Sequence, residues 1–127
     1  MSVHVDPKKI LIVDDDLANV AAITQILLRN GYDVLHEEDE QRVVRTAKKS
    51  RPDLIICNAE SRKLDAFRMV KAVCQAPRMR GTPVLFLTES RELTWAGPDL
   101  LGPKQYLRKP FTREQLAIAV QENLKRV

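Results

Sequence analysis

The stretch "KILIVDDDLANVAAITQILLRNGYDVL" (Lys9–Leu35) contains one complete strand–helix–strand pattern. The apolar run Lys9–Val13 has the length of a buried strand, and Tyr32–Leu35 predicts a second strand. Asp16 suits the N-cap of the helix between them, and Gly31 suits its C-terminal stop. Apolar residues recur in this helix at helical spacing: Leu17, Val20, Ile23 (or Thr24 in its place) and Leu27. Two strands joined by a helical crossover predict a parallel pair.

The same alternation continues along the chain. Further strands are predicted at Asp53–Cys57, Thr82–Thr88 and Gln105–Arg108, and further helices at Glu40–Lys49, Asp65–Gln75 and Thr112–Val127. In Glu89–Lys104 two Gly-Pro pairs interrupt the pattern, and because proline inside a helix costs roughly 3 kcal/mol, we expect a short or broken helix there. The predicted fold is α/β, a doubly wound five-stranded parallel sheet with helices on both faces.

Length and composition indicate a single globular domain. The chain has 127 residues, 44% hydrophobic and 30% charged, so we expect one domain over residues 1–127 with a loose tail at 1–8. Its apolar runs are too short to span a membrane, and the N-terminal residues lack the apolar core of a signal peptide. We therefore expect a cytoplasmic protein with no membrane partner, in which Cys57 and Cys74 are reduced, buried thiols.

The net charge of +4 permits attraction to nucleic acid or to acidic proteins. The basic residues are scattered, and aromatic residues make up only 5% of the chain, which is too few to suggest stacking platforms for single strands. Direct nucleic-acid binding is therefore not favoured.

Polar residues follow several of the predicted strands. They are Asp14 and Asp15 after the first strand, Asn58 after the third, Thr88 at the end of the fourth and Lys109 after the fifth. The carboxyl ends of parallel strands meet at one edge of a sheet. Adjacent carboxylates repel unless a cation lies between them, and Mg²⁺ suits a site of few carboxylates. A lysine and a hydroxyl would complete a pocket for a phosphoryl group or its mimic.

Each of these residues alone has an ordinary structural explanation, such as helix capping by the aspartates. Together, on one edge, they favour a functional site.

These motifs resemble the receiver domains of bacterial two-component response regulators. The resemblance covers essentially the whole chain and is carried by "ILIVDDD" (Ile10–Asp16), "NGYDV" (Asn30–Val34), "RPDLIICN" (Arg51–Asn58), "LDAF" (Leu64–Phe67), "TPVLFLT" (Thr82–Thr88) and "YLRKPF" (Tyr106–Phe111). It implies the flavodoxin-like (βα)5 receiver fold.

The resemblance also implies roles for individual residues. In that family the acidic pair at Asp14 and Asp15 helps to bind Mg²⁺, and the backbone carbonyl at Glu60 is the remaining protein ligand. The position of Asn58 is normally an aspartate that accepts a phosphoryl group from a histidine kinase.

Switch residues follow from the same resemblance. The residue at Thr88 senses the phosphoryl group, Lys109 contacts it, and the aromatic ring at Tyr106 rotates between inward and outward states. Tyr106, Arg108 and Arg113 would form a basic face for an acidic partner, although solvated surface charges explain them equally well.

The chain departs from the family at several positions. An amide at Asn58 is a poor nucleophile and cannot form a stable acyl phosphate. It also removes one negative charge from the metal site, so we expect weakened Mg²⁺ binding. Arg62 replaces the usual proline, Ala66 the usual glycine, and Glu89 a small residue beside the phosphoryl entrance, where its charge would repel a phosphoryl group.

We therefore expect a degenerate, phosphorylation-independent pseudo-receiver. It would be a signalling interaction module and not an enzyme, with a histidine kinase, a downstream effector or a second copy of the chain as its partner. One alternative is an ordinary phosphoaccepting regulator seen as an Asp-to-Asn variant at position 58. Another is a small phosphatase with Asp14 or Asp15 as nucleophile, for which a second acidic cluster is missing from the sequence.

Overall fold

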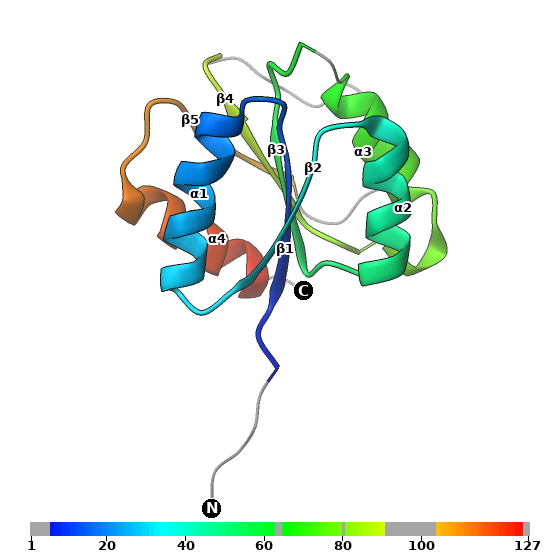
Figure 1. Ribbon diagram of the computed structural model, residues 1–127, viewed down its shortest axis with the longest axis horizontal. Coiled ribbons are helices and arrows are strands. Elements are labelled where there is room, and N and C mark those ends of the chain that lie inside the picture. The colour runs from blue at the N-terminus through cyan, green and yellow to red at the C-terminus, as the bar shows by residue number, and fades with distance from the viewer. Residues whose placement is uncertain (1–5, 63–64, 80, 91–103, 126–127) are drawn as a thin grey trace, which may run out of the picture.

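The computed structural model describes residues 6–62, 65–79, 81–90 and 104–125 (Figure 1). Five strands form one parallel sheet in the order β2-β1-β3-β4-β5. The strands are β1 (Lys9–Val13), β2 (Asp33–Glu37), β3 (Leu54–Asn58), β4 (Val84–Thr88) and β5 (Lys104–Arg108). The predicted doubly wound, five-stranded sheet is confirmed.

Helices cover both faces of the sheet, as Figure 1 shows. On one face lie α1 (Leu17–Arg29) and α4 (Arg113–Lys125), and on the other lie α2 (Glu40–Ser50), α3 (Ala66–Cys74) and the short 3-10 helix η1 (Pro77–Met79). The broken helix expected over Glu89–Lys104 falls mostly on residues 91–103, which lie outside the described residues.

The predicted helix caps are present. The Asp16 side chain accepts hydrogen bonds from the backbone N–H groups of the first turn of α1. Gly31, with a φ of +83°, follows the end of α1 in the left-handed conformation that favours glycine. Thr112 and Gln115 form the reciprocal capping box expected before α4, each side chain accepting from the other residue's backbone N–H.

Four of the five strands differ from their predicted bounds, β2 and β3 also at their carboxyl ends. β2 extends to Glu37, past the predicted end at Leu35, because it follows β1 residue by residue in register up to Val13. β3 includes Asn58, which pairs with Leu87 of β4. The backbone of Asn58 is thus held in the sheet.

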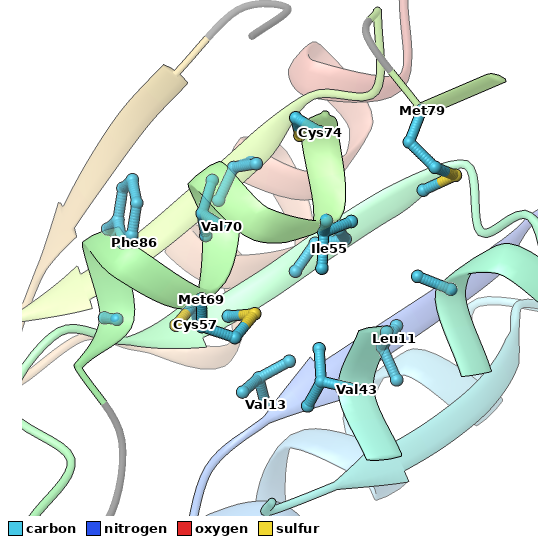
Figure 2. Close-up of a cluster of buried hydrophobic side chains, with 14 residues drawn as sticks. Leu11, Val13, Val43, Ile55, Cys57, Met69, Val70, Cys74, Met79 and Phe86 are labelled. Atoms are coloured by element: carbon cyan, nitrogen blue, oxygen red, sulfur yellow. The ribbon is translucent and has the colours of Figure 1, made fainter. Parts of the chain in front are cut away.

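Side chains on both faces of the sheet are buried, which explains why the central strands are continuous apolar runs. Figure 2 shows the core under α2 and α3, which includes Leu11, Val13, Val43, Ile55, Cys57, Met69, Val70, Cys74, Met79 and Phe86. The core under α1 and α4 includes Ile10, Ile12, Leu27, Ile56, Leu85, Leu116 and Val120. The two cores hold the strands together from both faces. The polar residues that follow the strands therefore lie along one edge of the sheet.

Cys57 and Cys74 are both free and buried, as predicted. In the part of the chain that the structure describes, we find no helix with the length and apolar character needed to cross a membrane.

The Cys57 thiol should make the protein less stable in alkaline solution. Burial raises its pKa well above the ordinary value, and the nearby Asp14 charge raises it further. Above about pH 8.5 the thiol ionises in the unfolded chain but not in the folded one. The free energy of unfolding should then fall with a slope that approaches about 1.4 kcal/mol per pH unit from this group as the unfolded thiol becomes fully ionised. Urea unfolding from about pH 8.5 to about pH 9.5 should show this dependence, and Cys57→Ala should remove it. Equal slopes for the two proteins would contradict the prediction.

Candidate functional site

Asn58 lies at the centre of the polar edge, where β1 and β3 lie side by side. In this strand order the connections from β1 and β3 lead to opposite faces, and open α/β sheets bind ligands at such a point. The Asn58 Nδ2 donates to Asp14 Oδ1 at 3.1 Å. Its Oδ1 accepts from Lys109 Nζ at 2.8 Å and from the Glu60 backbone N–H at 3.0 Å. The amide therefore uses both its donor and its acceptor. It joins residues that follow β1 (Asp14), β3 (Glu60) and β5 (Lys109).

Asp14 is the buried carboxylate of this site, with 1% of its surface exposed. Its Oδ1 accepts from the Asp16 backbone N–H at 2.9 Å as well as from Asn58. Its backbone carbonyl lies 2.8 Å from His36 Nε2, and since a carbonyl can only accept, Nε2 carries the hydrogen. Asp15, the next residue, is half-buried. Neutral N–H donors thus surround the carboxylate oxygen for which the sequence predicted a cation.

Glu60 contributes its side chain, whereas the sequence suggested a role only for its backbone carbonyl. The Thr88 Oγ1 donates to Glu60 Oε2 at 2.7 Å, and the Glu89 backbone N–H donates to Oε1 at 2.7 Å. Lys109 Nζ lies 3.6 Å from the same Oε1. Thr88 accepts from the Ser90 backbone N–H at 3.0 Å, which leaves its hydroxyl hydrogen for Glu60. The carboxylate therefore has a hydroxyl, an amide and an ammonium group around it.

Thr88 and Lys109, both predicted site residues, thus meet on the Glu60 carboxylate. Thr88 has 1% of its surface exposed, and the Lys109 side chain 20%, so the two donors are well shielded from water. No feature of the sequence pattern pointed to the Glu60 side chain. The available signal was an acidic residue placed two positions after the strand that ends at Asn58.

The three residues predicted for an interaction face lie around β5 and the start of α4. The Tyr106 ring stacks on Phe86 with ring centroids 5.6 Å apart, and 37% of the residue is exposed. Arg108 is exposed two residues further along β5. Arg113 lines a cavity of about 320 Å³ with Asn19 of α1 and with Lys109. Tyr106 therefore packs on the α3 side of the sheet, and Arg113 lies beside α1.

Hydrogen bonds of the site compete with a bound Mg²⁺. Asn58 Nδ2 donates to Asp14 Oδ1, and Lys109 Nζ donates to the Asn58 oxygen. Glu60 directs its carboxylate to Thr88, Glu89 and Lys109. Among residues 6–62, 65–79, 81–90 and 104–125, no group of three or more His, Cys, Asp or Glu side chains is placed to hold a metal ion.

A scan against protein-family models finds the response regulator receiver domain over residues 10–121. The chain is 34% identical over 120 residues to the alkaline phosphatase synthesis transcriptional regulatory protein PhoP of Bacillus subtilis, covering 94% of this chain and 49% of that protein. The chain thus spans about half the length of curated relatives such as this one.

Solved structures give the same result. The chemotaxis protein CheY4 of Vibrio cholerae superimposes with a TM-score of 0.80 at 28% identity, covering 93% of this chain and 99% of that one. The receiver domain of the sensor histidine kinase PA1611 of Pseudomonas aeruginosa gives a TM-score of 0.81 at 27% identity, covering 94% and 99%. That structure has a magnesium ion coordinated in its active-site cleft.

Proposed function

The chain belongs to the response regulator receiver family, and from that premise we propose that it is a two-component signalling module that acts without phosphorylation of position 58. Receiver domains are signalling modules, and the relative PhoP of Bacillus subtilis is a transcriptional regulatory protein.

The observation that carries the proposal is the amide at the phosphoacceptor position. Asn58 is uncharged, and its oxygen already accepts two hydrogen bonds, from Lys109 and from the backbone of Glu60. Phosphorylation would require a carboxylate oxygen to attack phosphorus and to leave a stable acyl phosphate, and an amide supplies neither. The contacts of Asn58 instead hold the end of β3 to Asp14, which follows β1, and to Lys109, which follows β5. Asn58 acts as a structural link.

Magnesium affinity should be low for the same reasons. The site has one carboxylate fewer than the family pattern, and a donor group faces Asp14. We propose Asp14, Asp15 and the Glu60 backbone carbonyl as the candidate protein ligands.

Partners would be a histidine kinase, a downstream effector or a second copy of the chain. We propose that they bind the surface that includes Tyr106 and Arg108, with Arg113 at its margin, through an acidic patch of their own. Tyr106 combines exposed apolar area with a polar tip, a combination common at interfaces. The chain would act in the cytoplasm.

An ordinary phosphoaccepting regulator with an Asp-to-Asn variant at position 58 is the second candidate. Retention of Asp14, Thr88 and Lys109 favours it. The placement of Glu60 weighs against it, because its carboxylate fills the position next to these residues.

A comparison in cells tests the proposal. In the organism that carries the chain, removing the cellular supply of acetyl phosphate should leave the signalling phenotype intact, because no phosphoryl group at position 58 is needed. Tyr106→Ala should impair signalling while the protein level stays unchanged. Deletion of the gene supplies the reference phenotype, and Arg29→Ala, an exposed position at the end of α1, is the control. A phenotype that survives Tyr106→Ala would remove that surface from the proposal.

A further inference from the structure

Glu60, Thr88, Glu89 and Lys109 form a compact group at the polar edge, and three of them act as donors to the fourth. We name the three donors, the Thr88 hydroxyl, the Glu89 backbone N–H and the Lys109 ammonium, the anion cradle. Both carboxylate oxygens of Glu60 are used: Oε2 by Thr88, and Oε1 by Glu89 with Lys109 nearby. A hydroxyl, an amide and a cation that converge on one group are the donor set that binds oxyanions.

Glu60 is held through its backbone as well as through its carboxylate oxygens. The Glu60 backbone N–H donates to Asn58 Oδ1 at 3.0 Å, and Lys109 Nζ reaches the same oxygen at 2.8 Å. Asn58 therefore positions both the residue that carries the anion and the cation that faces it. An aspartate at position 58 would attract Lys109 more strongly and would compete with Glu60 for it.

We propose that the Glu60 carboxylate is the built-in ligand of the anion cradle and occupies the space of a phosphoryl group. The inference rests on the proposed function, because it treats the cradle as the place where a receiver would hold phosphate. Glu60 is covalently attached, so its effective concentration at the cradle is on the order of millimolar or higher. Free phosphate and small phosphodonors must displace it before they can bind.

The occupied cradle has a consequence for regulation. Until the Glu60 carboxylate is displaced, Thr88 and Lys109 are held by an anion, so the edge of the sheet keeps an anion-bound arrangement without any kinase. Because the Glu60 side chain is 38% exposed, the carboxylate remains within reach of solvent and can be displaced. Occupation of the anion cradle therefore depends on the negative charge and on the length of the Glu60 side chain.

Titration with inorganic phosphate, followed by the NMR signal of the Glu89 backbone amide, tests the proposal. In Glu60→Ala the cradle is vacant, and phosphate should shift this amide with an affinity at least about tenfold tighter than in the unaltered chain. Glu60→Gln keeps the length but loses the charge and should give an intermediate affinity. Lys109→Ala added to Glu60→Ala should abolish the shift.

The matched control is Glu122→Ala, which removes the same charge from an exposed position on α4. It should behave as the unaltered chain does. Equal phosphate affinity with and without Glu60 would overturn the proposal, and so would a folded Glu60→Ala protein whose Glu89 amide does not respond to phosphate. The titration measures reversible binding only, so it can fail while signalling without phosphorylation still holds, and the cell experiment can fail while Glu60 still fills the cradle.

Discussion

The double variant Asn58→Asp/Glu60→Ala is expected to accept a phosphoryl group from acetyl phosphate in the presence of Mg²⁺. The introduced carboxylate oxygen attacks phosphorus, an acyl phosphate forms, and acetate leaves. Thr88, the Glu89 N–H and Lys109 contact the Glu60 carboxylate in the unaltered chain. When Glu60 is removed, these three donors can bind the phosphoryl oxygens.

The single variants separate the two contributions. Glu60→Ala alone should give no adduct, because the amide at position 58 remains. Asn58→Asp alone should react at least about tenfold more slowly than the double variant, a difference of about 1.4 kcal/mol in activation free energy. Quench-flow or manual sampling followed by intact-protein mass spectrometry gives the rates. Equal rates for Asn58→Asp and the double variant would show that Glu60 does not obstruct the cradle.

The largest stability effect is expected at Phe86. This side chain is fully buried at the centre of β4, and its ring contacts Phe67 at 5.1 Å and Tyr106 at 5.6 Å between centroids. Phe86→Ala should lower the free energy of unfolding by about 3–5 kcal/mol, because it leaves a cavity between two aromatic rings. That is a large share of the roughly 5–15 kcal/mol by which a domain is stable.

Urea unfolding measures this loss, provided that the slope of the free energy with urea stays the same in variant and parent. Leu28→Ala is the matched control, because Leu28 is 56% exposed on α1 and should change the free energy by no more than about 0.5 kcal/mol. A loss below about 1 kcal/mol for Phe86→Ala would mean that the core closes over the missing ring.

The sheet could be predicted because its central strands are apolar on both faces and its helices carry recognisable caps. Asp16 and Gly31 marked the two ends of α1, and the capping box of Thr112 and Gln115 marked the start of α4. The parallel arrangement then placed Asp14, the β3 residue Asn58, Thr88 and Lys109 on one edge, because strand ends of a parallel sheet share an edge.

The direction of the Glu60 side chain could not be predicted. It depends on the turn after β3, where the Glu60 N–H bonds to the Asn58 side chain, and on the distance from this turn to Thr88. Hydrophobic periodicity carries no information on either. Similarly, the position of Arg113 beside α1 depends on the path of the chain between β5 and α4.

Whether the unaltered chain can be phosphorylated is the most direct test of the account. The chain is incubated with acetyl phosphate and Mg²⁺, and its intact mass is measured before and after, with Asn58→Asp/Glu60→Ala beside it as the variant able to react. We predict that the mass of the unaltered chain does not change. A stoichiometric gain of one phosphoryl group, released by mild base as an acyl phosphate would be, would contradict the account.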